Sequence, residues 1–316
     1  MSASRLDDLR MVDPILTTIA QEYTNDIFIR DSLFPNVKVS KLKGKVPVFN
    51  KESFITRETL RGTRAKSNRI NPGEFDLVAF ETKERDVEMS IDYLEEEETA
   101  EFLNYETKVT KQLIDILSLG KEKEAADLAQ DTSLYASDMK RAILIGEAFD
   151  DYSITTLDPL TYIRAGMDTI RSKIAKFPNT MVMGITSYRA LINHPKILAR
   201  VKNSGVNKLN AAFLSELLEI PNISVGTGVY SNDGNTFADI WNDNIILAYV
   251  DSNDAAKRSE YNPSYGYTFQ REGKPEVDTY FENGGKLRII RNTDNYGIKV
   301  TAQDAAYIIS NTNHLT

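Results

Sequence analysis

Few residues of this chain have the type and spacing that enzyme chemistry requires. The 316 residues include no cysteine and only two histidines, His194 and His314. Without cysteine there are no disulfides, no thiolate nucleophiles and no cysteine-ligated zinc sites. Neither histidine stands at helical spacing from a carboxylate, as a zinc hydrolase requires. We expect His194, which precedes Pro195, to mark a helix boundary, and His314 lies in the terminal tail.

Two short stretches match part of a ligand-binding motif. Gly226-Thr227-Gly228 begins like a dinucleotide fingerprint, but the third glycine is missing and a strand is predicted to follow. The stretch 251–254 opens like a calcium loop, but Ala256 occupies the position of the required glycine. Phosphate-binding loops and nucleophile elbows are absent from the sequence. We therefore predict a protein that is not an enzyme, with no catalytic residue, no metal site and no cofactor.

The charged residues of one segment change sign partway along it. Residues 35–73 contain ten Lys or Arg and only two acidic residues, a net charge of +8. Residues 74–101 contain twelve acidic and two basic residues, a net charge of −10. A basic arm beside an acidic element suits a subunit that binds copies of itself. The side chains predicted to make these contacts are Arg57, Arg61, Arg64, Lys66, Arg69, Glu84, Asp86, Glu88, Glu95, Glu96, Glu97 and Glu98.

The elements predicted to carry these charges are a long hairpin and a long helix. Valines alternate with other residues over 37–48, and turn residues interrupt the polar stretch 55–74. A strand is then predicted over 75–89, with Glu84, Asp86 and Glu88 on one face and Arg85, Val87 and Met89 on the other. Two strands of about ten residues would make a hairpin projecting on the order of 30 Å, which is marginal without a partner surface.

A helix is predicted from Tyr93 to about Gln130, with a possible break at Gly120. Acidic residues 95–98 lie in its first turns, where the positive end of the helix dipole stabilises negative charge. A helix of thirty-odd residues spans roughly 50 Å, more than most globular helices, and predicts a spine that crosses the molecule. Its predicted apolar stripe is Phe102, Tyr105, Val109, Leu113, Ile116 and Leu117.

The flanking regions give an ordinary mixture of helices and strands. A short helix is expected after Asp13-Pro14, with Ile15, Leu16, Ile19 and Tyr23 on its apolar face. Another helix begins at Asp158-Pro159 and carries an apolar stripe of five residues, Leu160, Ile163, Met167, Ile170 and Ile174. Further predicted helices cover 187–193, 195–201 and 208–219. Predicted strands cover 180–185, 222–230, 245–250, 277–281, 286–291, 298–300 and 305–310, with turns at 231–235, 283–285 and 292–295.

Bulk properties narrow the class of protein further. No window approaches eighteen apolar residues, so no membrane span is expected, and the first residues lack an apolar stretch of signal-peptide length. The net charge of −8 argues against a protein that coats nucleic acid, because phosphate binding requires a dominant positive field.

The order of these parts resembles the major capsid proteins of tailed bacteriophages with the Hong Kong 97-type fold. The resemblance rests on the opening MVDPILTTIAQEYTNDIFIRDSLFPNVKVSKLKGKVPVFN, the basic stretch ending in GTRAKSNRINPGE, and the block DPLTYIRAGMDTIRSKIAKFPNTMVMGITSYRALINHPKI. It implies an α+β fold with an N-terminal arm, an extended β-hairpin loop, a long spine helix, and peripheral and axial domains. The implied ranges are 1–44 for the arm, 45–92 for the loop, 93–155 for the peripheral domain with its spine helix, 156–274 for the axial domain, and 275–316 for the return strands.

The resemblance also implies a function. It predicts a virion protein without an active site, assembled in the host cytoplasm from hexamers and pentamers into an icosahedral shell around double-stranded DNA that it does not bind specifically. The implied partners are other copies of the chain and separate scaffold, portal and decoration proteins, with no membrane. Because the recognisable arm starts by about Met11, we expect no cleaved scaffolding segment within the chain.

Three alternatives remain open on the sequence. An encapsulin-type shell around a cargo enzyme would use the same fold. The second half could instead be an α/β enzyme domain with an unrecognised site, although the chain is short of histidine and lacks a nucleophile motif. The third alternative is a monomeric module whose basic hairpin touches nucleic acid, but no aromatic residue is interleaved between Arg57 and Pro72 to stack on bases.

Overall fold

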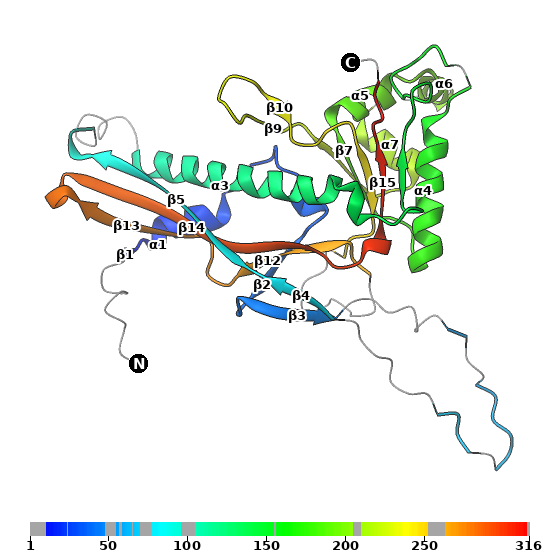
Figure 1. Cartoon of the computed structure of the whole chain (residues 1–316), viewed down its shortest axis with the longest axis horizontal. Coiled ribbons are helices and arrows are strands. Elements are labelled where there is room, and N and C mark those ends of the chain that lie inside the picture. The colour runs from blue at the N-terminus through cyan, green and yellow to red at the C-terminus, as the bar shows by residue number, and fades with distance from the viewer. Residues whose placement is uncertain are drawn as a thin grey trace.

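The computed structural model describes residues 11–23, 25–47, 55–56, 59–64, 66–69, 77–95, 105–154, 156–204, 210–251 and 263–314. Two β-sheets lie toward opposite ends of the molecule and the helix α3 runs between them (Figure 1). The architecture is α+β, as predicted from the sequence.

The first sheet is built around one long strand. β14 (Leu287–Val300) pairs on one side with β13 (Glu276–Glu282) and then β12 (Gly266–Arg271). Its other side pairs with β5 (Lys83–Asp92) over Leu287 to Tyr296. Two short strands complete the sheet: β1 (Met11–Val12) joins β13, and β2 (Asn36–Val39) joins β12 in parallel.

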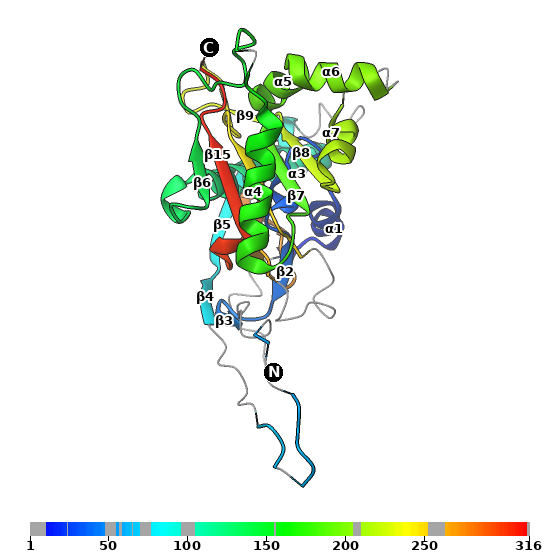
Figure 2. The ribbon, with the colours of Figure 1, turned by 90° about the vertical axis from the view of Figure 1, so that its right-hand side faces the viewer.

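The second sheet has five strands, in the order β6 (Lys140–Ala142), β15 (Ala306–Ser310), β11 (Ile245–Ala248), β7 (Thr180–Gly184) and β8 (Asn222–Gly226). β6 and β8 therefore form its opposite edges, as Figure 2 shows. Its central strands are buried on both faces, which is why the sequence reads there as short continuous apolar runs.

Helices cover both sheets. α1 (Pro14–Glu22) and α3 (Tyr105–Gln130) pack on the first sheet, and α4 (Pro159–Ile174) packs on the second. α5 (Ile185–Asn193), α6 (Pro195–Ser204) and α7 (Ala211–Leu218) surround one end of the second sheet. Asp13 and Asp158 cap α1 and α4 through their carboxylates, as predicted. The predicted stripe of α4 is confirmed, because its members are buried or pack against the main core.

Two small two-stranded sheets and four 3-10 turns complete the described elements. Two separate ribbons pair β3 (Lys43–Pro47) with β4 (Leu77–Glu81), and β9 (Val229–Tyr230) with β10 (Ala238–Asp239). Single 3-10 turns are η2 (Arg30–Ser32), η4 (Thr132–Leu134), η5 (Asn283–Gly285) and η6 (Gln303–Ala305).

Several helix predictions need correction. Gly120 does not break α3, since one glycine in a helix interior costs only about 1 kcal/mol relative to alanine. Within the stripe, Ile114 is buried while the predicted Ile116 is 47% exposed. Ile15, predicted on the apolar face of α1, is 74% exposed. The predicted start of the long helix at 96–104, including Phe102, lies outside the described residues.

Three strand predictions also need correction. The turn predicted at 292–295 is wrong, because these residues lie buried inside β14. The charged residue among them has partners within the fold, because Asp294 pairs with Lys121 of α3 and accepts a hydrogen bond from the Gln270 side chain. The strand predicted over 75–89 is interrupted at Thr82, and the one predicted over 222–230 is divided into β8 and β9.

Candidate assembly surface

The basic arm leaves the body through the β3–β4 ribbon. The ribbon pairs five residues on each strand, from Lys43 opposite Glu81 to Pro47 opposite Leu77. Beyond it, the described arm residues 55–56, 59–64 and 66–69 contain no strand, and the rest of the predicted ten-residue hairpin strands lies outside the described residues. Figures 1 and 2 show the described arm residues projecting well beyond both sheets.

The phenyl ring of Phe80 fixes this ribbon against the first sheet. It stacks on Phe269 of β12, with ring centroids 4.3 Å apart and planes 14° apart. The same ring also covers Gly44, the residue opposite Phe80 on β3, where a Cβ would lie 2.6 Å from two ring atoms. Glycine at this position lets the ring lie flat over the ribbon, and the stacked pair gives the base of the arm one orientation.

The change of direction between β4 and β5 occurs at Thr82. β5 pairs with β14 as far as Lys83 opposite Tyr296. At the next residue of β14, Gly297, a Cβ would lie 2.1 Å from the carbonyl oxygen of Glu81. The chain therefore crosses directly over Gly297 and leaves the sheet, and the Thr82 backbone N–H bonds to the carbonyl oxygen of Leu42 instead.

Substituting Gly297 by alanine should lower the free energy of unfolding by roughly 1–3 kcal/mol, because the added methyl group meets backbone that cannot rotate away. The matched control is Gly120→Ala, whose Cβ meets nothing within 4 Å and should stabilise α3 by up to about 1 kcal/mol. Urea denaturation of unassembled subunits measures both. Equal stability of Gly297→Ala and the parent would contradict this account of the crossing.

The predicted basic side chains that the structure describes are all exposed on the arm. They are Arg61, Arg64, Lys66 and Arg69, whereas Arg57 lies outside the described residues. Arg64 adopts a left-handed backbone conformation with φ of 67°. Among the described residues, none of these four cations forms an ion pair with a carboxylate.

The predicted acidic side chains of β5 lie on the sheet face turned away from α3. Glu84, Asp86 and Glu88 are exposed, while Val87 and Met89 pack beneath α1 and α3. This confirms the two predicted faces of the strand. Glu95 is also exposed, just after β5, and Glu96, Glu97 and Glu98 lie outside the described residues.

Neighbouring side chains order part of the acidic face. The hydroxyl of Tyr280 on β13 donates a hydrogen bond to Glu88 at 2.9 Å, and Arg291 of β14 pairs with Asp278 at 2.6 Å. Partial burial and then the Glu88 carboxylate raise the pKa of Tyr280. Among the described residues β5 pairs only with β14, so its outer edge is a sheet edge.

The arm and the acidic face are not brought together within one chain. From Thr82, β4 leads toward the arm and β5 leads away from it along the sheet (Figure 1). The two charged surfaces therefore point in opposite directions from one crossing. Within one chain, the described residues of the basic arm and of the acidic face therefore lie apart.

A buried polar junction that the sequence reading missed anchors α3. The carboxylate of Glu122, 1% exposed, accepts hydrogen bonds from the backbone N–H groups of Ile29 and Arg30 at 3.0 Å and from the indole N–H of Trp241 at 2.7 Å. The adjacent residue of α3, Lys121, is also buried and pairs with Asp294 of β14 at 3.4 Å. Burial lowers the pKa of Lys121, and the Asp294 carboxylate opposes that shift.

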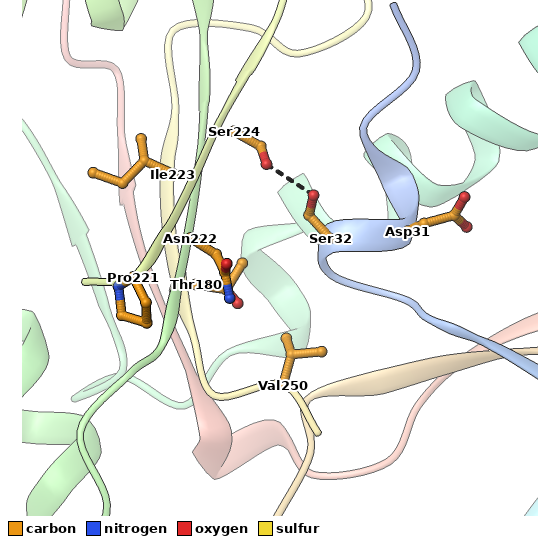
Figure 3. Close-up of a pocket in the computed structure, with 8 residues that line it drawn as sticks. All are labelled: Asp31, Ser32, Thr180, Pro221, Asn222, Ile223, Ser224 and Val250. Atoms are coloured by element: carbon orange, nitrogen blue, oxygen red, sulfur yellow. Dashed lines mark hydrogen bonds between the residues drawn. The ribbon is translucent and has the colours of Figure 1, made fainter. Parts of the chain in front are cut away.

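The second sheet carries a pocket at its β8 edge. It has a volume of about 470 Å³, and Ser32 and Ser224 share a hydrogen bond of 2.8 Å across one side of it (Figure 3). Its lining residues are Asp31, Ser32, Thr180, Pro221, Asn222, Ile223, Ser224 and Val250. This set lacks a nucleophile with a neighbouring base.

The remaining sequence candidates occupy structural positions. His194 is the C-cap of α5, as predicted at a helix boundary, and burial lowers its pKa. After Gly226 the chain continues into β9 rather than a helix, as the sequence predicted for this glycine-containing stretch. In the described part of the chain, no three His, Asp or Glu side chains gather to hold a metal ion. None of the helices described there is long and apolar enough to cross a membrane.

Comparison with known proteins gives a consistent answer over nearly the whole chain. No protein-family model matches it. It is 41% identical over 310 residues to the major capsid protein of Burkholderia phage BcepMu, covering 98% of this chain and 99% of that one. The crystal structure of a phage-related protein from Bordetella bronchiseptica superposes with a TM-score of 0.77 at 27% identity, covering 96% and 98% of the two chains. The capsid of a native GTA particle matches in fold, with a TM-score of 0.57 at 13% identity over 91% and 90%.

Proposed function

This chain belongs to the family of phage major capsid proteins, and on that premise we propose that its copies form hexamers and pentamers that build an icosahedral shell around double-stranded DNA. Its structural role in a capsid shell, its Hong Kong 97-type fold and its place in the virion follow from its relatives. The observation that carries the proposal is the full-length identity of 41% to a capsid subunit. The encapsulin-type and enzyme alternatives are not favoured by these relatives.

The contact proposed between neighbouring copies joins the basic arm of one to the acidic face of the next. Support comes from the exposure of both charged sets and from their separation within a single chain. A single exposed ion pair contributes at most about 1 kcal/mol. Four cations facing Glu84, Asp86 and Glu88 form a network that is repeated at every subunit, and charge complementarity of this kind sets the register of an interface.

The domains proposed for the chain correspond to the two sheets. Residues 45–92 provide the loop, 93–155 the peripheral part with the spine helix, and 156–274 the axial part, while 1–44 and 275–316 supply the arm and the return strands. The five-stranded sheet with α4 to α7 supports an axial unit, and the sheet under α3 supports a peripheral one. β15, from the last range, joins the five-stranded sheet and ties the two parts together.

The partners proposed beyond other copies are separate scaffold, portal and decoration proteins, met during assembly in the host cytoplasm. Packaged DNA is proposed to lie against the shell without specific binding. The net charge of −8 supports this, because it keeps phosphate groups from adhering to the wall.

Electron microscopy of the purified protein tests the proposed function. We expect closed shells, or sheets of hexamers where closure is incomplete, under conditions of moderate salt. A second readout is binding of the isolated subunit to duplex DNA, which should be weak at physiological salt. A protein that stays a uniform monomer at all concentrations, or binds duplex DNA tightly, would count against the proposal.

A further inference from the structure

A tight turn next to β6 holds two large apolar side chains in solvent. The backbone N–H of Glu147 bonds to the carbonyl oxygen of Leu144 at 2.9 Å, and Gly146 takes the left-handed conformation with φ of 93°. Leu144 is 62% exposed and Ile145 is 90% exposed. β-branched residues are poor turn formers, and an exposed isoleucine forgoes the stabilisation of burial. The position is therefore costly for the free subunit.

The turn is also held rigidly. On one flank the Ile143 backbone N–H bonds to the carbonyl oxygen of Ser310, and on the other the Phe149 N–H bonds to that of Thr312. At its base the guanidinium of Arg141 pairs with Glu147 at 2.9 Å. A backbone already fixed in place loses little conformational entropy when the turn docks, so Ile145 is suited to act as an interface anchor.

The pocket at the β8 edge lies on the opposite edge of the same sheet from the turn, and an apolar side chain could enter it. Pro221, Ile223 and Val250 supply apolar walls to its volume of about 470 Å³. Asp31 is the charged residue of its lining, with a side chain 58% exposed. Arg141 beside the turn has the opposite sign, and its side chain is 44% exposed. One edge thus carries an exposed apolar turn beside a cation, and the other carries a pocket with apolar walls beside a carboxylate.

We propose that the 144–147 turn of one copy inserts Ile145 into the β8-edge pocket of the next, with Arg141 facing Asp31. This rests on the self-assembly proposed above and adds a second contact, distinct from that of the arm. Because the turn and the pocket lie on different edges, the contact is head-to-tail. Each copy uses both surfaces, and the same contact recurs around a ring.

The absence of cysteine makes a direct crosslinking test possible. Assembled particles of the double variant Ile145→Cys, Asn222→Cys are oxidised and run on a denaturing gel without reductant. We expect a ladder of covalent oligomers, and no crosslink from either single variant. Dimers from Ile145→Cys alone would show turn-to-turn contact and overturn the proposal. So would shells of normal appearance with no ladder, an outcome that leaves the proposed function intact.

A second variant set separates docking from folding. Ile145→Asp should reduce the yield of particles at least tenfold at a fixed subunit concentration, with an unchanged melting temperature because the side chain is exposed. Ile145→Leu keeps an apolar anchor and should assemble as the parent does. Normal assembly of Ile145→Asp would overturn the proposal. A parent protein that never assembles would instead contradict the proposed function.

Discussion

Replacing Glu122 by alanine should lower the free energy of unfolding of the subunit by about 3–5 kcal/mol, the range for removing one partner of a buried charged pair. The substitution leaves two backbone N–H groups, the Trp241 indole N–H and the Arg30 guanidinium without their shared acceptor. The Trp241 indole is buried and the other donors are partly buried, so water replaces few of the lost bonds and most of the desolvation penalty is felt. The loss should also free η2, and with it the start of β2, from α3.

Urea denaturation of unassembled subunits measures the effect. The matched control is Glu124→Ala on the same helix, which removes a partly exposed pair with Arg85 and should cost no more than about 1 kcal/mol. Glu122→Gln retains one acceptor oxygen and should fall between the two. Similar losses for Glu122→Ala and Glu124→Ala would mean that the junction is not an anchor of the helix.

Reversing three charges on the arm, with Arg61, Arg64 and Arg69 all changed to Glu, should abolish assembly into particles. The variant places like charges against Glu84, Asp86 and Glu88 of the neighbour, and like charges in contact disfavour association. Folding should be unaffected, since all three side chains are exposed on the projecting arm. Electron microscopy and sedimentation measure particles, and the melting temperature of the subunit measures folding.

The complementary variant sharpens this experiment. Combining the reversed arm with Glu84, Asp86 and Glu88 changed to Lys should restore particles, because the interface is again of opposite sign. The control for net charge changes Arg164, Arg189 and Lys196 to Glu, three exposed residues on the helices of the second sheet, and should assemble. Assembly of the reversed arm, or failure of the control to an equal degree, would rule out the proposed contact.

Much of the fold was predictable wherever a local signal decides the structure. Asp13-Pro14 and Asp158-Pro159 predicted two helix starts because caps and proline act within one turn. The apolar run at 180–185 predicted a buried strand, which is found over Thr180–Gly184, and the alternation over 84–89 predicted the two faces of β5. The charge reversal needed no structure at all, and it identified the arm and acidic strand as surfaces.

The parts that escaped prediction depend on partners far away in the chain. Glu122 meets Ile29 across 93 positions, and Lys121 meets Asp294 across 173. On the sequence, both helix residues look like members of an exposed charged face. The polar run 292–295 likewise reads as a turn until its partners on α3 and β12 are known. The exposed Ile145 has a detectable signal in the sequence, an apolar pair before a glycine and an acid, but its solvent exposure cannot be deduced from that signal.

The row of polar residues inside β14 also determines which of several pairings the strand can adopt. Side chains along a strand alternate between faces, so a slip by one residue would turn Asp294 away from Lys121 and Gln270. An apolar strand of fourteen residues, paired with β5, β13 and β12 at once, would tolerate such a slip far better. Desolvating these groups costs stability, and in return only the native alignment gives Asp294 both of its partners. The polar interior of β14 therefore selects one strand register. A chain in which β14 has slipped is less stable and is selected against before it can be built into a larger structure.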